Sequence, residues 1–144
     1  MTTLEVPGAR LYYETYGSGP LMLMVPGASG AGDGFKRVTE YLAARYIVVV
    51  NDRRGFSRSR LDGRQDYTHR SLTDADDVRR LIEHLIDESA TIFGTSSGAI
   101  VALEVLTCHP AVVRTLTQPV EFAREVLQTL SRTERGLVPA SLGG

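Results

Sequence analysis

The sequence predicts an α/β fold: a mainly parallel sheet flanked by helices, and two observations lead to this prediction. Three short, largely apolar segments are typical of strands that are covered on both faces: Leu21–Val25, Tyr46–Val50 and Ala90–Phe93. Each is followed by a stretch with apolar residues at helical spacing. Strands that alternate with helices at this interval form right-handed crossover units, and therefore a mostly parallel sheet.

An N-terminal β-hairpin is expected before the first of these strands. Leu4–Val6 and Arg10–Tyr16 are two extended segments, and Pro7–Ala9 between them is a turn sequence. Side chains along residues 10–16 alternate in character, which suits an edge strand with one wet face.

Three helices are predicted within the alternating region: Phe35–Ala44, Thr73–Leu85 and Ser97–Cys108. The apolar stripe of the first is expected to contain Phe35, Val38, Tyr41 and Leu42. The stripe of the second is expected to contain Val78, Leu81, Ile82 and Leu85.

The C-terminal part differs from the rest. Pro119 opens a short predicted helix, Val120–Leu130, and the residues from Arg135 onward are rich in Gly, Pro and Ser. We therefore expect a single domain over residues 1–131 and a flexible tail over residues 132–144.

Bulk composition is that of an ordinary soluble globular protein. The 144 residues are 42% hydrophobic and 23% charged, with a formal net charge of -1, so nothing indicates binding to nucleic acid or to an anionic membrane. The longest apolar runs are too short to span a bilayer, and Met1–Glu5 does not begin a signal peptide, which predicts a cytoplasmic location. A single cysteine, Cys108, excludes an intramolecular disulfide and gives no support for a cysteine metal site. We expect no cofactor and no metal.

Gly94–Gly98 fits the pattern G-x-S-x-G, and its context matters more than the pattern. It follows a buried strand and opens a helix, the strand–turn–helix setting in which a serine is exposed at the carboxyl end of a sheet. Ser96 is therefore the candidate nucleophile. The alternative is a helix cap rich in Ser and Gly.

Pro26–Gly30 forms a glycine turn after the strand Leu21–Val25, at the same predicted edge of the sheet. Acyl transfer develops negative charge on a carbonyl oxygen, which two fixed backbone donors stabilise. We assign these donors to the amides of Ala28 and Ser97. The alternative here is a flexible glycine loop.

Asp52–Ser59 follows the strand Tyr46–Val50. Asp52 and Arg54 can pair and fix this loop near the carboxyl edge of the sheet, so we interpret their role as structural.

Together these segments resemble the α/β-hydrolase superfamily, in which H-G-x-x-G, D-x-R-G-x-G-x-S and G-x-S-x-G occur in this order. The resemblance covers about residues 3–116, with Pro26 in place of a common histidine and Ser57 in place of a common glycine. It implies a serine hydrolase, an esterase-like enzyme acting on a small-molecule acyl substrate.

The resemblance also implies a catalytic acid and a histidine well downstream of the serine, and only 46 residues follow Gly98. Residues 117–127 are similar to the last helix of the family, so we expect that the chain is joined near Leu116–Gln118 and that the cap and the acid/histidine segment are missing. Asp74, Asp76 and Asp77 suit first-turn helix charges better than a triad acid.

Of the histidines, His84 is expected on a helix surface, and His109 at the far end of the helix that Ser96 precedes. His69 lies in a loop and is a poor candidate for the base. The expected activity is weak or absent.

Two other functions stay open. One is a non-catalytic, degenerate hydrolase that acts as a binding or assembly module; an unpaired edge beside the strand that precedes Ser96 would then favour a homo-oligomer. The other is an NAD(P)-binding Rossmann protein, because Gly27–Gly32 follows a strand and Asp52 ends the next one. The glycine spacing, G-x-x-G-x-G, fits that reading poorly.

Overall fold

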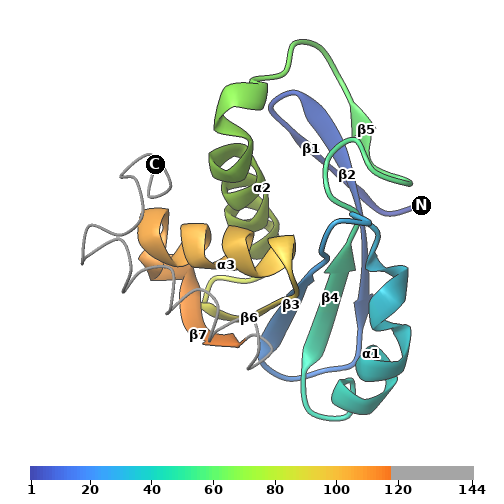
Figure 1. The fold of residues 1–144 in the computed structure, drawn as a ribbon. Helices are drawn as coiled ribbons and strands as arrows, with labels where there is room; N and C mark the ends of the chain where they lie inside the picture. The colour runs from blue at the N-terminus through green and yellow to red at the C-terminus, as the bar shows by residue number, and fades with distance from the viewer. Residues whose placement is uncertain (118–144) are drawn as a thin grey trace.

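A computed structural model of the chain describes residues 1–117 (Figure 1). Its strands are β1 (Thr3–Val6), β2 (Ala9–Tyr16), β3 (Leu21–Val25), β4 (Ile47–Asn51), β5 (Arg60–Leu61), β6 (Ala90–Gly94) and β7 (Val113–Thr117). Its α-helices are α1 (Lys36–Leu42), α2 (Arg70–Leu85) and α3 (Ser97–Cys108). Single 3-10 turns are η1 (Gly32–Phe35), η2 (Tyr67–His69) and η3 (Pro110–Val112).

The sheet has the strand order β1-β2-β4-β3-β6-β7, and the short β5 pairs with β2 outside this path. β3 pairs in parallel with both β4 and β6, and β6 pairs in parallel with β7, while β1 and β2 form an antiparallel hairpin. The predicted α/β class, the mainly parallel sheet and the hairpin are confirmed. Gly8, in the hairpin turn, has a φ of 78°, which explains why a glycine stands there.

Two expectations about the sheet edges are wrong. β2 is not an edge strand, because β1 covers one side of it and β4 pairs with the other in an antiparallel register. Nor is β6, the strand before Ser96, at the edge: within residues 1–117, β7 lies outside it and has no further neighbour. Val113–Thr117 follows the 3-10 turn η3, which Pro110 opens after α3 has ended at Cys108.

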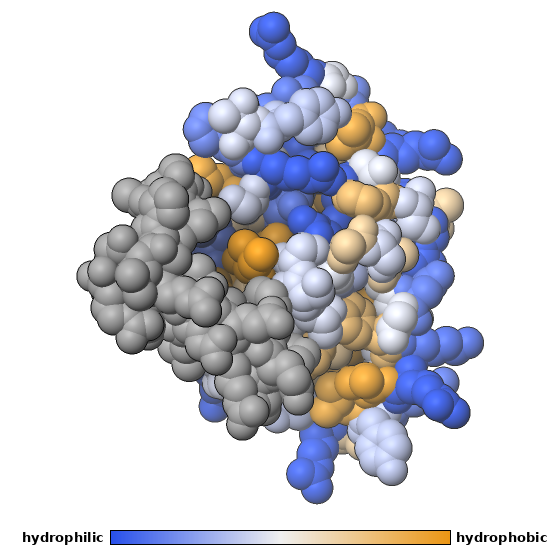
Figure 2. All heavy atoms as spheres, viewed as in Figure 1, coloured by the Kyte–Doolittle hydropathy of each residue, from blue (hydrophilic) through white to orange (hydrophobic). Residues whose placement is uncertain are grey.

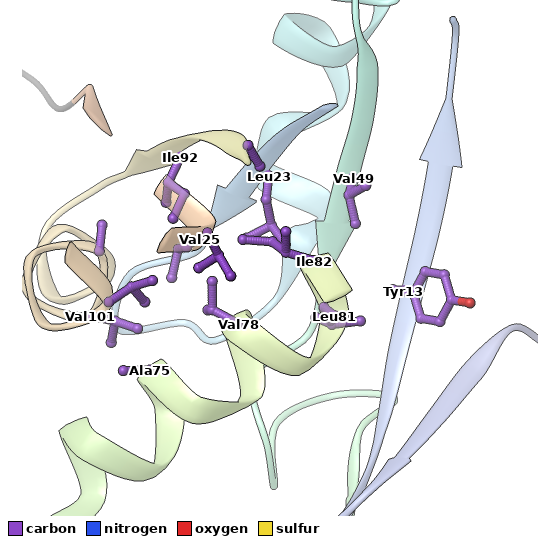
Figure 3. Packing of buried hydrophobic residues seen from close by; sticks show 14 of the residues in the cluster. Tyr13, Leu23, Val25, Val49, Ala75, Val78, Leu81, Ile82, Ile92 and Val101 are labelled. Atoms are coloured by element: carbon purple, nitrogen blue, oxygen red, sulfur yellow. The ribbon is translucent and has the colours of Figure 1, made fainter. Parts of the chain in front are cut away.

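The core lies on both faces of the sheet, because successive side chains of a buried strand point in opposite directions. Leu23 and Val25 of β3 pack against α2 and α3 in the larger cluster, together with Ile92 of β6 (Figure 3). Met24, the residue between them, packs on the other face of the sheet against Phe35, the residue that precedes α1. Burial of each large aliphatic side chain stabilises the fold by roughly 1.5–3 kcal/mol.

The predicted stripe of α2 is confirmed at Val78, Leu81 and Ile82, all fully buried, and Leu85 packs at the margin of the same cluster. The stripe of the first helix is partly wrong. Val38 is 44% exposed and Tyr41 is 89% exposed, whereas Thr39 is buried. The cause is the 3-10 turn η1, which rotates the face that the following helix presents to the sheet.

Charged and polar side chains dominate the face seen in Figure 2, and apolar side chains form small separate groups between them. None of the helices in residues 1–117 has the length and apolar character needed to cross a membrane. The predicted helix Val120–Leu130, the C-terminal part of the domain expected over 1–131, and the tail expected over 132–144 lie outside the described residues.

Candidate active site

Ser96 occupies a tight turn between β6 and α3. Its backbone has φ 51° and ψ -123°, a conformation that L-residues rarely adopt and that costs about 1–3 kcal/mol. The side chain is exposed, beside the N-terminus of α3. A strained, exposed serine held by a strand and a helix is the geometry that the motif predicted.

The two outer glycines of the motif allow this turn to form. A Cβ at Gly94 would lie 2.5 Å from the carbonyl oxygen of Gly98, and a Cβ at Gly98 would lie 2.3 Å from the carbonyl oxygen of Val25. Any side chain at either position would push α3 away from the sheet. The motif is thus explained by contacts between β6, α3 and the end of β3, and the helix-cap alternative does not explain the strain at Ser96.

The loop after β3 packs directly against this turn. A Cβ at Gly27 would lie 3.3 Å from the Cβ of Ser96, so the absence of a side chain lets the loop approach the serine. The amide of Gly30 donates to the carbonyl of Gly27 at 2.9 Å, and Gly30 has a φ of 67°, so the segment is an ordered turn. Ala28, at its tip, is exposed.

Within residues 1–117, the backbone bonds of the two segments leave the amides of Ala28 and Ser97 without an acceptor. Neither donates a backbone hydrogen bond in the turns, loops and caps of residues 1–117, and Ser97 is the first residue of α3, where helix amides have no partner within the helix. The structure therefore brings Ser96, Ser97 and the Ala28 loop together at the carboxyl edge of the sheet.

The expected pair between Asp52 and Arg54 is wrong, although both residues are structural. The fully buried Asp52 accepts hydrogen bonds from the Gly32 amide (2.8 Å) and from the Arg58 amide (3.0 Å) and Nε (2.7 Å). Burial alone would raise the pKa of Asp52, but these donors outweigh it and hold the pKa below its usual value. Ser59 completes the loop by donating to the Asp52 carbonyl at 2.6 Å.

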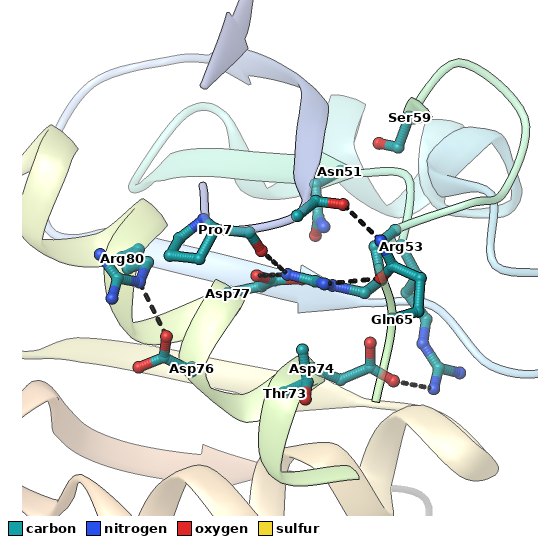
Figure 4. Close-up of polar contacts among 12 residues, drawn as sticks. Pro7, Asn51, Arg53, Ser59, Gln65, Thr73, Asp74, Asp76, Asp77 and Arg80 are labelled. Carbon is teal, nitrogen blue, oxygen red and sulfur yellow. Dashed lines mark hydrogen bonds and ion pairs between the residues drawn. The ribbon is translucent and has the colours of Figure 1, made fainter. Parts of the chain in front are cut away.

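Arg54 pairs instead with Asp77 of α2. Two parallel hydrogen bonds of 2.7 Å join the guanidinium to the carboxylate, and both side chains are buried. Asp76 is not a first-turn helix charge as expected, and neither are Asp74 and Asp77. α2 begins earlier, at Arg70, and the carboxylates of Asp74 and Asp77 point toward the loop after β4, as Figure 4 shows.

Sequence reasoning missed Arg53. Its guanidinium bonds to Asp74 at 2.6 Å, to Ser97 Oγ at 3.1 Å and to the Gly27 carbonyl at 3.3 Å. One signal could have pointed to it: Asp74 and Asp77 are three residues apart, on the helix face that also carries Val78 and Leu81, and carboxylates placed there need buried cationic partners.

Each of the three histidines contacts a residue other than Ser96. His84 lies on the surface of α2, as expected, with its ring 6.4 Å from that of Tyr13. His109 follows the last residue of α3 and lies 3.9 Å from Asp76. His69 Nδ1 lies 2.8 Å from Asp66 Oδ2, and both side chains are exposed. In residues 1–117 no group of three or more metal-binding side chains surrounds a common point.

Two of the larger cavities lie near these loops, and Ser96 lines neither. One, of about 660 Å³, lies between α1 and the ends of β2 and β4. The other, of about 210 Å³, lies between the loop after β4 and the start of α2, and Phe56, Tyr67 and Arg70 line it.

A strained serine between a parallel strand and a helix, with a glycine loop packed against it, defines the class of α/β hydrolases. The chain belongs to this family: the family described as "alpha/beta hydrolase fold" matches residues 20–118.

Two curated relatives illustrate the range of the family. The chain is 43% identical over 114 residues to the uncharacterized hydrolase YraK of Bacillus subtilis, an alignment that covers 79% of the chain and 42% of YraK. It is 32% identical over 92 residues to the magnesium-chelatase 30 kDa subunit of Rhodobacter capsulatus, which covers 64% of the chain and 32% of that protein. The chain thus spans about two fifths or less of the length of these relatives.

Among solved structures, Est816, an enzyme that degrades N-acyl homoserine lactones, aligns with a TM-score of 0.73 and 28% identity over 81% of the chain and 44% of Est816. A marine microorganism esterase aligns with a TM-score of 0.66 and 27% identity over 75% of the chain and 40% of the esterase.

Proposed function

We propose that this chain is a serine-nucleophile hydrolase of ester or related acyl bonds in small molecules. Ser96 Oγ attacks the carbonyl carbon and forms a C–O bond, its proton passes to a base, and the carbonyl oxygen takes up the electron pair. The amides of Ala28 and Ser97 donate to this oxygen. The intermediate collapses, the alcohol leaves with a proton, and water then hydrolyses the acyl-Ser96 ester and restores the serine.

The observation that carries the proposal is the strained, exposed Ser96 next to a loop so close that a Cβ added at Gly27 would lie 3.3 Å from the Cβ of Ser96. Family membership supports it, and it favours a hydrolase over the dinucleotide-binding alternative. The N-acyl homoserine lactones that Est816 degrades contain an ester and an amide bond, which agrees with this class of substrate. The cytoplasmic location and the independence from cofactors and metals remain predictions from the sequence.

We expect turnover by this chain alone to be slow. Within residues 1–117, the three histidines have their contacts elsewhere than at the serine, so we assign the Ser96 proton to a solvent species. In a serine protease that lacks one triad member, the oxyanion donors and binding leave about 10³–10⁴-fold acceleration over the reaction in water. We expect this chain to accelerate ester hydrolysis by a factor in that range.

The test is hydrolysis of p-nitrophenyl butyrate by the purified chain and by Ser96→Ala. Turnover above the buffer rate that Ser96→Ala abolishes supports the proposal, and equal rates for the two proteins refute it. His69→Ala serves as a control. It should retain the rate of the unmodified chain, because His69 is bonded to Asp66 and has no assigned role.

The second candidate is a non-catalytic assembly module that forms a homo-oligomer. The observation in its favour is β7, whose outer side has no strand partner among residues 1–117 and which can template a second chain. Light scattering distinguishes the two: a concentration-dependent dimer together with equal rates for the chain and Ser96→Ala favours the module. A monomer at all concentrations excludes it.

A further inference from the structure

One guanidinium, that of Arg53, bonds to both segments that carry the proposed oxyanion donors. Arg53 Nη1 donates to the carbonyl oxygen of Gly27, next to Ala28, at 3.3 Å and to Oγ of Ser97 at 3.1 Å. Arg53 Nη2 pairs with Asp74 of α2 at 2.6 Å (Figure 4). Three segments that are far apart in the sequence therefore meet at one side chain.

The main chain of Arg53 holds the same loop a second time. Its amide donates to the carbonyl of Gly30 at 2.7 Å, so the turn from Gly27 to Gly30 is bonded at both ends to one residue. Phe56 supports the turn from the side, because a Cβ at Gly30 would lie 2.2 Å from the Phe56 ring. The turn has little room to move independently of Arg53.

The arginine itself is fixed. Its side chain is 12% exposed and that of Asp74 is 4% exposed. The cavity that both residues line measures only about 10 Å³, so no alternative position for the guanidinium is open on that side. A planar fork that reaches several acceptors at once is a property of arginine that lysine does not share.

Arg53 is also distinct from the arginine of the family pattern. In D-x-R-G, Asp52 and Arg54 fill the fixed positions and Arg53 fills the variable one. Its contacts with the loop after β3 and with Ser97 are therefore a feature of this chain that the motif does not explain.

We propose that Arg53 is a positioning residue that sets the separation of the Ala28 and Ser97 amides, and that Asp74 holds Arg53 in place. The catalytic consequence rests on the proposed function, since it assumes that these amides stabilise an oxyanion formed at Ser96. The structural consequence, a fixed relation between the two amides, does not depend on that assumption.

The kinetic test compares Arg53→Met and Arg53→Lys with Arg79→Met. Arg79 is a matched control, because it also pairs with α2 carboxylates, those of Asp76 and Glu83, but does not touch the serine turn. Misplacing catalytic groups by about 1 Å costs about 100-fold in rate. Both Arg53 variants should lose about this much in kcat on p-nitrophenyl butyrate, with little change in KM, whereas Arg79→Met should match the unmodified chain.

A second readout works whether or not the chain turns over substrate. In ¹⁵N–¹H spectra, the Ala28 and Ser97 amides should shift and exchange faster with solvent in Arg53→Met than in Arg79→Met. Asp74→Asn should displace the same two amides in the same direction. Ser97→Ala, which removes one acceptor and keeps the backbone amide, should displace the Ala28 amide less, and it provides a milder variant if Arg53→Met does not fold.

The outcomes separate the two proposals. Equal rates for the chain and Ser96→Ala, together with displaced amides in the Arg53 variants, refute the proposed function and retain the positioning role. Turnover that depends on Ser96 but is unchanged in both Arg53 variants overturns the positioning role. The positioning role is also overturned if the Ala28 and Ser97 amide signals are unchanged in the Arg53 variants, or if Arg79→Met loses as much kcat as they do.

Discussion

Replacement of Gly98 by alanine tests whether the serine turn is held by close contact between α3 and the end of β3. The added Cβ would lie 2.3 Å from the Val25 carbonyl oxygen and 2.6 Å from that of Pro26, and neither backbone atom can rotate away. Because ordinary contact begins near 3.4 Å, the helix and the strand must separate by about 1 Å. Overpacking of this kind costs about 1–3 kcal/mol.

A helical position would normally favour alanine over glycine by up to about 1 kcal/mol, whereas the close contact at Gly98 predicts that alanine destabilises the fold. We expect a net loss of about 2 kcal/mol, which lowers the Tm of a chain of this size by about 6 °C in a thermal melt followed by circular dichroism. Gly34→Ala is the control, since a Cβ there meets nothing within 4 Å, and its Tm should stay close to that of the unmodified chain. A Gly98→Ala variant that melts at or above the unmodified chain would refute the reasoning.

Three further predictions concern strain, a buried ion pair and pH. Ser96→Gly should melt a few degrees above Ser96→Ala, because glycine relieves strain of about 1–3 kcal/mol at φ 51° and loses less than that in chain entropy; an equal or lower Tm contradicts this. Arg54→Met should lower the free energy of unfolding in urea by about 3–5 kcal/mol, because it leaves Asp77 buried without its partner, whereas Arg10→Met, at the exposed pair with Glu5, should cost less than about 1 kcal/mol. The pKa of Asp52 is lower in the folded chain than its unfolded value of about 3.9, so the ionised carboxylate stabilises the fold above that value, and this stabilisation is lost as pH falls through the folded pKa. The stability advantage over Asp52→Asn should therefore shrink as pH falls below about 5, and a constant difference would count against it.

The order of strands and helices could be predicted from the sequence because it depends on local periodicity and on short motifs. α3 begins and ends where the sequence indicated, since Gly98 is required by packing and Pro110 stops the helix. The position of Ser96 followed for the same reason, because its strained turn is encoded by the glycines on either side of it.

The partners of charged residues could not be predicted in this way. The sequence suggested a pair between Asp52 and Arg54, which are two residues apart, but the strand ends at Asn51 and the chain enters a turn at Arg54, so the two side chains do not share one face. Asp52 turns toward Arg58, while Arg54 turns toward Asp77, which is 23 residues away. Such choices depend on which elements lie on each side of the segment, and this is known only once the sheet has formed.

Three consecutive residues of the loop after β4 bond to different segments at the carboxyl edge of the sheet, because their side chains point in different directions. Asp52 bonds to the start of η1, Arg53 to the serine turn and to α2, and Arg54 to α2 and to the carbonyl of Pro7 in the hairpin. Each bond joins segments that hydrophobic packing alone would leave free to slide, because dispersion contacts are individually weak and non-directional. The apolar clusters therefore account for the compactness of residues 1–117, and three consecutive charged residues account for the orientation of the loops around Ser96. This division explains why an arginine with no catalytic chemistry of its own is the side chain on which the geometry of the candidate site depends.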